Sequence, residues 1–515
     1  MSVVTAAKPV TKVVIVGGGT AGWMTAAALS RTIGHLPGMD IQLIESDAIG
    51  TIGVGEATIP QILIYNQMIG IDEAEFIRET RATFKLGIEF VDWRRIGDSY
   101  IHPFGSYGVD MEGIEFHHFW LRARQLGLTT ALEDYSIGAV AARAGKFMPP
   151  QPQNPNSPLA RMAYAFQFDA GRYARYLRSR AEAQAVVRTE GRIIEVIRNG
   201  ESGHVEAVML ENGSRIEGEL FIDCSGFRSL LLGEAMEVAF EDWSKWLPCD
   251  RAIAVPCLHK PGRDGGNDSP YTRSTARPAG WQWRIPLQHR VGNGHVYSSA
   301  HMSDDAALDL LLANLDGSPM AEPNRIRFQA GHRKQAWSKN VVAIGLAGGF
   351  LEPLESTAIH LVQSGIARLL TLWPHTGFSQ PEINRFNSDS AQEYLDIRDF
   401  LVLHYKATER DDSEFWRYCR NLPPPDGLAA KLEMYRSSGR IFREHEELFT
   451  ETSWLAVMEG QGIAANGWHP VAHTVPAAEL MNRMRDIQGI IAQNVSNMPS
   501  QAQFLRDNGA LAIED

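Results

Sequence analysis

The stretch that decides the fold is Lys12-Val13-Val14-Ile15-Val16-Gly17-Gly18-Gly19-Thr20-Ala21-Gly22. Its first five residues form an apolar run with the length and composition of a buried strand. Gly17, Gly19 and Gly22 follow with the spacing G-x-G-x-x-G, which alone is a weak signal. The flanking segments decide its meaning, because such a loop binds a pyrophosphate where it joins a strand to a helix.

Those flanking segments are present. Residues 21–29 have helical composition, and a second apolar run at 41–44 ends at Glu45. The order of strand, glycine loop, helix, strand and acid predicts a βαβ unit that binds a dinucleotide. We expect Thr20 and Ala21 to meet the pyrophosphate at the helix N-terminus, and Glu45 to accept hydrogen bonds from a ribose.

Composition narrows the class of protein. The chain has 515 residues, 44% of them hydrophobic, and a net charge of −12. It carries no basic block, so a nucleic-acid partner is not expected. Its four cysteines lack zinc-like spacing, and we expect no metal and reduced thiols. We find no signal-peptide core and no apolar run that could span a bilayer, which predicts a cytoplasmic protein without a membrane contact.

Later segments extend the sheet across a long insertion. Residues 185–225 read as successive β runs, and 341–346 is another buried strand, followed by a helix at 357–373. This discontinuous layout resembles FAD proteins of the aromatic hydroxylase superfamily. The expected fold is α/β, with a Rossmann-like FAD-binding core over 1–375 and a substrate-region insertion at about 241–333. Ile193 matches a position that meets the flavin nucleotide in related folds, and a plain core residue is the alternative.

The C-terminal part has a different character. Helical spacing is visible at 393–403, 413–420, 428–435 and 477–493. A proline run at 423–425 interrupts it. We expect residues 376–515 to form a mostly helical module that caps the substrate.

Six motifs in order give the chain a family resemblance. The most unusual is Trp281-Gln282-Trp283-Arg284-Ile285-Pro286, a W-x-W-x-I-P run rich in rare residues. The others are GGGTAGW at 17–23, GVGEATIP at 53–60, FKLG at 84–87, HPFG at 102–105 and FLEPLEST at 350–357. Together they resemble the flavin-dependent halogenases, and the tryptophan halogenase family in particular. The resemblance covers most of the chain.

The resemblance implies a catalytic pair, Lys85 and Glu355. An amine can hold hypohalous acid by hydrogen bonding or become a haloamine, and apolar neighbours lower the pKa of a lysine. Glu355 is implied to orient the oxidant, to stabilise a cationic arenium and to accept its proton. The alternatives are a lysine whose ammonium reaches water, and a carboxylate favoured by the dipole of the following helix.

The same resemblance assigns neighbouring positions. Thr357 and Ala358 match residues whose backbone N–H groups bind halide, although the family commonly has glycine in place of Ala358. Leu346 and Ile359 match flavin contacts. His102 and Phe104 match residues that line an indole pocket, with ordinary core contacts as the alternative.

Trp281, Trp283 and Pro286 are implied to be a steric barrier that keeps an organic substrate away from the flavin. The chain has one complete glycine fingerprint and no second nucleotide-binding unit. We therefore expect a two-component system, in which a separate flavin reductase supplies FAD as FADH2. The resemblance also implies that the reaction requires a halide ion. The sequence does not determine the oligomeric state, and a homodimer is one alternative.

The substrate is expected to be an electron-rich arene. The paired tyrosines that hold tryptophan in the family have no match at 447–463, where Trp454 could stack on an indole or fill the core. Indole or an indole derivative is therefore favoured over free tryptophan. Two alternatives remain: a single-component FAD monooxygenase that hydroxylates an aromatic, and a flavin-binding protein without turnover.

Overall fold

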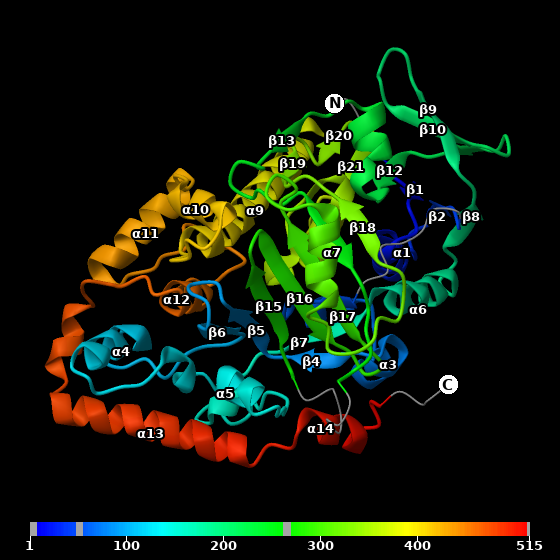
Figure 1. The fold of residues 1–515 in the computed structure, drawn as a ribbon. Helices are drawn as coiled ribbons and strands as arrows, with labels where there is room; N and C mark the ends of the chain where they lie inside the picture. Colours follow the sequence, from blue (N-terminus) through cyan, green and yellow to red (C-terminus); the bar gives the residue numbers. More distant parts are fainter. Residues whose placement is uncertain (1–7, 48–54, 261–268, 512–515) are drawn as a thin grey trace, which may run out of the picture.

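The computed structural model describes residues 8–47, 55–260 and 269–511. Its first sheet has the strand order β20-β21-β12-β1-β2-β8, and all neighbours except β20 and β21 are parallel. The strands are β1 (Lys12–Val16), β2 (Asp40–Glu45), β8 (Val187–Glu190), β12 (Leu220–Asp223), β20 (Trp337–Ser338) and β21 (Val341–Ala343). Helix α1 (Thr20–Thr32) packs beside α6 (Ala170–Glu182) and α8 (Ala358–Thr371). The α/β, Rossmann-like prediction is confirmed (Figure 1).

The glycine loop explains why this sheet begins as it does. Gly17 has a φ of +113°, and a Cβ there would lie 2.3 Å from the carbonyl oxygen of Cys224. A Cβ on Gly22 would lie 1.8 Å from the carbonyl oxygen of Gly17, so the helix packs tightly on the turn. A Cβ on Gly19 would meet no atom within 4 Å. The loop is therefore tight toward the protein and open in front of the N-terminus of α1.

A second, seven-stranded sheet has the order β18-β14-β17-β16-β15-β5-β6. Its strands are β5 (Gly87–Val91), β6 (Ser99–Pro103), β14 (Arg251–Ala254), β15 (Thr272–Arg277), β16 (Gly280–Pro286), β17 (Val291–Tyr297) and β18 (Asn324–Arg327). The insertion predicted at 241–333 thus supplies five strands, and β15 pairs in parallel with β5, with Thr272 opposite Ile88. This pairing brings three sequence motifs, at 84–87, 102–105 and 281–286, onto one sheet or its edge.

Three small sheets complete the β structure. Strands β3 (Gly55–Ala57), β7 (Ala165–Asp169) and β4 (Thr83–Lys85) form one, with β7 in the centre. Strands β9 (Ile193–Arg198), β10 (Val205–Leu210) and β11 (Arg215–Glu217) form a meander, and Asn212 and Gly213 lie in the connection between the last two. The third contains β13 (Phe240–Asp242), β19 (Gly331–Arg333) and β22 (Gly349–Phe350).

Helices dominate the C-terminal part, as predicted. They are α9 (Gln380–Lys406), α10 (Glu414–Asn421), α11 (Asp426–Ser438), α12 (Glu451–Gly460), α13 (Ala477–Ser496) and α14 (Gln501–Asp507). In Figure 1 they run around one side of the seven-stranded sheet, from α9 in yellow to α13 and α14 in red. Helix α9 begins at Gln380, 13 residues before its predicted start at 393. Its first half is polar and buries only Ile383, Phe386 and Ser390, so it lacks the apolar stripe from which a helix is predicted.

The remaining helices are α2 (Gln61–Met68), α3 (Glu73–Thr80), α4 (Phe116–Gln125), α5 (Ile137–Arg143) and α7 (Asp304–Leu312). Helix α13 packs against α4 and α5, so the C-terminal helices share a core with earlier segments. The division at residue 375 therefore stays a prediction. Within the described ranges, none of the helices has the length and apolarity needed to cross a bilayer.

Candidate active site

Lys85 is the last residue of β4, at the point where the small sheet meets the seven-stranded one. The strand is anchored next to it, because the hydroxyl of Thr83 donates to the carbonyl oxygen of Pro286 at 2.7 Å. The Lys85 side chain is fully buried, and Nζ donates to the carbonyl oxygen of Thr58 at 3.0 Å and to Oγ of Ser356 at 2.7 Å. The alternative in which the ammonium reaches water is therefore wrong.

Burial lowers the pKa of Lys85 to about 7, against an opposing effect of the Glu355 carboxylate, which raises it. Nζ also lies 5.4 Å from the ring centroid of Phe104. At neutral pH a substantial fraction of this amine is unprotonated, and a free amine has the lone pair that an electrophilic halogen requires.

Glu355 ends a 3₁₀ turn, Pro353–Glu355, and Ser356 follows with a φ of +59°. Its carboxylate is buried between two imidazoles. His102 Nδ1 lies 3.0 Å from Oε2, and His404 Nε2 lies 2.8 Å from Oε1. Burial alone would raise the pKa of Glu355, but His102 and then His404 outweigh that effect and lower it to about 2. The carboxylate is held charged by side chains, and not only by the dipole of the following helix.

The predicted halide position lies at the start of α8. The helix begins at Ala358, and Thr357 is the N-cap residue without a side-chain capping bond. Thr357 is fully buried, and its hydroxyl oxygen has no hydrogen-bond partner among the described residues. A buried hydroxyl beside the first N–H groups of a helix fits a small anion.

The W-x-W-x-I-P run forms β16, with both tryptophans in the core. Trp281 and Trp283 are buried, and their ring centroids lie 6.1 Å apart. A Cβ on Gly294 would lie 2.0 Å from the Trp283 ring, so the neighbouring strand leaves room for that ring only by having glycine there. Pro286 ends the strand and is also buried. These contacts make the tryptophans rigid, and their role as a barrier stays a prediction.

Glu352 is a second buried carboxylate on the same loop. Its Oε2 accepts from Trp281 Nε1 at 2.8 Å and from the Tyr405 hydroxyl at 2.5 Å. Burial raises the pKa of Glu352 to about 7, and these two donors only reduce the shift. Strand β16, the Glu355 loop and α9 are therefore joined through one carboxylate.

The predicted substrate residues lie around Glu355 to different extents. His102 contacts Glu355 directly, and its ring centroid lies 5.8 Å from that of Phe400. Trp454 packs edge-on against Phe400 at 4.9 Å, and its indole nitrogen is buried without a partner in the described part of the chain. Phe449 stacks on Phe400 at 3.8 Å. An aromatic wall thus extends from the carboxylate to Trp454.

The predicted cofactor residues lie in different surroundings, and their role stays a prediction. Glu45 lies against Gly18, and its carboxylate pairs with Arg188 and, at 3.5 Å, with Arg178. Ile193 is buried in a core cluster with Val16 and Ile44.

From the other side of the loop, Gly345 approaches the side chain of Ala21, since a Cβ there would lie 3.0 Å away. Leu346 follows it, and Ile359 is buried in α8. The open space at Gly19 and the uncapped N-terminus of α1 fit a dinucleotide such as FAD. Residues 53 and 54 of the GVGEATIP motif lie outside the described residues.

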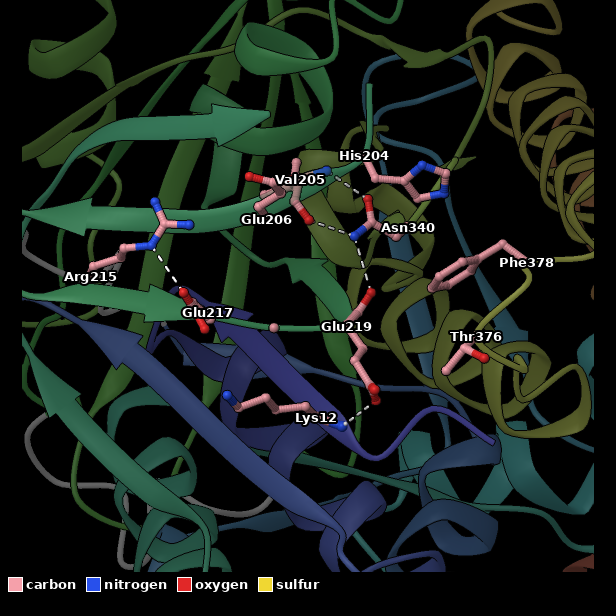
Figure 2. Close-up of a pocket in the computed structure, with 11 residues that line it drawn as sticks. Lys12, His204, Val205, Glu206, Arg215, Glu217, Glu219, Asn340, Thr376 and Phe378 are labelled. Atoms are coloured by element: carbon pink, nitrogen blue, oxygen red, sulfur yellow. Dashed lines mark hydrogen bonds and ion pairs between the residues drawn. The ribbon is translucent and has the colours of Figure 1, made fainter. Parts of the chain in front are cut away.

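A surface groove of about 600 Å³ lies elsewhere, beside the β9–β11 meander (Figure 2). Some of its polar side chains are already paired: Arg215 with Glu217 at 3.1 Å, and Asn340 with the backbone of Val205 and Glu219. None of the predicted site residues lines it.

The fold and this site define a flavin-binding enzyme with a buried amine and a buried carboxylate next to an aromatic wall. The chain matches the family model described as tryptophan halogenase over residues 12–477. It is 34% identical to tryptophan 7-halogenase KtzQ of Kutzneria sp. (strain 744), covering 96% of this chain and 97% of that one.

Two solved structures are still more similar. BrvH, a flavin-dependent halogenase from Brevundimonas sp. BAL3, is 47% identical, with a TM-score of 0.93 and 97% and 99% of the two chains covered. Xcc4156, a flavin-dependent halogenase from Xanthomonas campestris, is 46% identical with the same TM-score, covering 99% and 100%. The chain belongs to the tryptophan halogenase family. It is a flavin-dependent halogenase, which acts with reduced flavin on aromatic substrates.

Sequence reasoning missed three contacts of this site. His404 lies in the apolar run 400–405, where a single histidine more often fills a core, and Tyr405 follows it. Ser356 was not named as a site residue, whereas its hydroxyl accepts from Lys85. The neighbouring FLEPLEST motif could have pointed to Ser356, but no local signal indicates the contacts of His404 and Tyr405.

Proposed function

We propose that this chain is the halogenating component of a two-component system, with FADH2 supplied by a separate flavin reductase. FADH2, O2, halide and a proton give FAD, hypohalous acid and water, which is the chemistry that the bound flavin supplies. The hypohalous acid and an arene then give a haloarene and water. The observation that carries the proposal is the buried pair of Lys85 and Glu355, joined by Ser356 and shielded from solvent.

Lys85 and Glu355 have different proposed roles because their pKa values differ. Lys85, with a pKa of about 7, holds the oxidant by hydrogen bonding or as a haloamine. Glu355 stays ionised and accepts the proton from the ring carbon. The backbone at Thr357 and Ala358 is the proposed halide site, with chloride and bromide both suited to it.

Trp281, Trp283 and Pro286 would separate the flavin from the arene, so that the oxidant has to travel to Lys85. Separation of the two sites prevents direct reaction of the flavin with the substrate, and the position of substitution then depends on how the arene is bound.

The proposed substrate is indole or an indole derivative. The wall formed by Phe400, Phe449 and Trp454 suits a flat apolar ring. Recognition of free tryptophan also requires partners for an ammonium and a carboxylate. Glu447 and Lys431 are paired with each other at 2.8 Å, which leaves them poorly suited to that role.

The test is halide-dependent product formation from indole by the purified protein with FAD, NADH and an added flavin reductase. We expect halogenated indole only when the reductase and a halide are both present. Hydroxylated product formed with NADPH and no reductase would instead support a single-component monooxygenase. Discrete benzo-ring halogenation of tryptophan, with little turnover of indole, would overturn the substrate assignment.

A further inference from the structure

His404 is fully buried on α9 and makes two contacts through its ring. Its Nδ1 lies 2.9 Å from the carbonyl oxygen of Phe400, one helical turn earlier. Its Nε2 lies 2.8 Å from Oε1 of Glu355. Because a carbonyl oxygen can only accept, Nδ1 carries a hydrogen, and the tautomer of a neutral His404 is thereby decided.

The other ring nitrogen lies against Glu355. Nε2 is 2.8 Å from Oε1 of Glu355, but the two atoms do not have hydrogen-bond geometry. The contact therefore acts electrostatically, through the short distance between the imidazole and the carboxylate. His102 and then His404 oppose the effect of burial and lower the pKa of Glu355.

Aromatic packing holds the imidazole in place. The ring centroid of His404 lies 4.8 Å from Phe90, 5.2 Å from Phe400 and 6.0 Å from Trp93. Gln461 donates to the backbone carbonyl of His404 at 3.1 Å. The ring therefore has little freedom to turn away from Glu355.

The titratable groups around the pair come from several elements. His102 and Tyr100 lie on β6, and Lys85 lies on β4, where its charge interacts with Glu355. Tyr405 is the next residue of α9, but its hydroxyl faces Glu352. Of these groups, His404 and His102 are the two that contact Glu355 directly.

We propose that His404 is a positioning residue, which keeps Glu355 anionic and oriented to accept the arene proton. The inference rests on the proposed function. In the halogenation step the carbon–halogen bond forms as the oxygen–halogen bond breaks, and the departing hydroxide leaves as water with a proton from Lys85. The ring proton passes to Glu355, and proton release from Glu355 and uptake by Lys85 restore the site. His404 touches Glu355 and not the substrate.

Two substitutions separate the two contacts of the ring. In His404→Asn the amide nitrogen takes the place of Nδ1, so the hydrogen bond to the carbonyl oxygen of Phe400 is kept and the contact with Glu355 is lost. The nitrogen of His404→Gln matches Nε2 and offers Glu355 a neutral N–H. A matched control is His445→Gln. His445 is exposed, and its Nε2 pairs at 2.7 Å with Asp396, which lies on α9 like His404.

The first measurement is kcat for halogenation of indole as a function of pH, with a reductase present. In His404→Asn burial is no longer opposed as strongly, so the pKa of Glu355 rises and activity is lost as pH falls through it. We expect the acid side of the His404→Asn profile to lie at higher pH than that of wild type, with the largest fractional loss at the lowest pH tested and recovery toward wild type as pH rises. His404→Gln should fall between wild type and His404→Asn, and His445→Gln should match wild type. An equal loss at every pH would indicate a merely structural role and overturn the proposal.

A second measurement needs no turnover. Infrared difference spectra report the band of a protonated carboxyl group, and Glu355→Gln identifies the contribution of Glu355. The band should appear at higher pH in His404→Asn than in wild type, with His404→Gln as the substitute if His404→Asn does not fold. Appearance at the same pH in all of them would overturn the role of His404. Absence of halogenated product from the wild-type protein would overturn the proposed function instead.

Discussion

The surroundings of Glu352 and Glu355 differ sharply, although the two residues lie on one loop and both side chains are fully buried. Glu352 is bonded by Trp281 and Tyr405, which are neutral donors, and burial raises its pKa to about 7. Burial would also raise the pKa of Glu355, but His102 and His404 outweigh burial and lower that pKa to about 2. At Glu355 the two imidazoles outweigh the effect of burial on the pKa, whereas at Glu352 the two neutral donors do not.

One dipeptide of α9 contributes to both surroundings. His404 contacts Glu355 and Tyr405 contacts Glu352, from adjacent positions on the same helix. Glu355 interacts electrostatically with Lys85, and we propose that it accepts a proton during halogenation. Glu352 bonds Trp281 of β16 and Tyr405 of α9, and we expect it to act on stability. Substitutions at the two sites should thus have opposite profiles, with large effects on turnover at one and on pH-dependent stability at the other.

The largest effect is expected at the amine next to Glu355. Lys85→Ala should reduce halogenation by about a thousandfold or more, because the oxidant loses the group that holds it. Oxidation of FADH2 should continue at the wild-type rate, measured by flavin absorbance under the same conditions. The matched control is Ser356→Ala, which keeps the amine and removes one acceptor, and should cost only about tenfold. Retained halogenation in Lys85→Ala would remove Lys85 from the mechanism.

The next largest effect is expected at Glu355 itself. Glu355→Gln preserves the shape of the side chain but removes its charge and its capacity to accept a proton. We expect a loss of about a hundredfold to a thousandfold in kcat for indole, since both arenium stabilisation and proton removal are affected. Product formation is measured by chromatography with the reductase in excess. A loss smaller than that of Glu352→Gln would reverse the assignment of the two carboxylates.

The matching substitution at Glu352 should hardly change turnover. Glu352→Gln keeps an acceptor oxygen for Trp281 and Tyr405, and we expect kcat within about threefold of wild type. Stability should respond instead. Because the pKa of Glu352 is raised from 4.5 to about 7 on folding, its stabilising contribution is complete below the unfolded value and is lost as pH rises through about 7.

The wild-type Tm should therefore fall relative to that of Glu352→Gln between about pH 5 and about pH 8, by the equivalent of at most about 3 kcal/mol. Thermal unfolding followed by circular dichroism at several pH values measures this difference. A Tm difference that is independent of pH would contradict the shifted pKa of Glu352.

The smallest effect is expected for Tyr405→Phe. The substitution removes one donor to Glu352 and keeps the packing of the ring against Trp416. We expect a loss of about 1 kcal/mol in the free energy of unfolding and no change in the pH profile of halogenation. Urea unfolding and the pH profile are compared with those of His404→Asn. A shifted pH profile in Tyr405→Phe would show that the two carboxylates are coupled.

Patterns within a few residues of sequence were sufficient to predict individual strands, turns and helices. The run 12–22 predicted a strand, a tight turn and a helix, and Gly17 and Gly22 occupy positions where a Cβ would collide with backbone. The C-terminal helices were also predicted, but the polar first half of α9 was not, because helical propensity without an apolar stripe gives little signal.

Only part of the candidate site was predicted, because only some of its residues lie in motifs that can be recognised along the chain. Lys85 and Glu355 were named because their motifs resemble those of a family. His404 was not named, since a lone histidine in an apolar helix is chemically ambiguous until its neighbours are known. The pairing of β15 with β5 likewise joins segments separated by nearly two hundred residues, and no local pattern encodes such a contact.

By itself, the sequence determined the strand, glycine loop and helix of a βαβ unit and the motifs of a flavin-dependent halogenase, and it predicted a dinucleotide site there. Glycine geometry and apolar runs act over a few residues, so they can be read along the chain. Only the tertiary structure decided that the pKa of Glu355 is lowered while that of Glu352 is raised. That outcome depends on which side chains of β6, β16 and α9 approach each carboxylate, and electrostatic interactions follow distance in space and not separation in sequence.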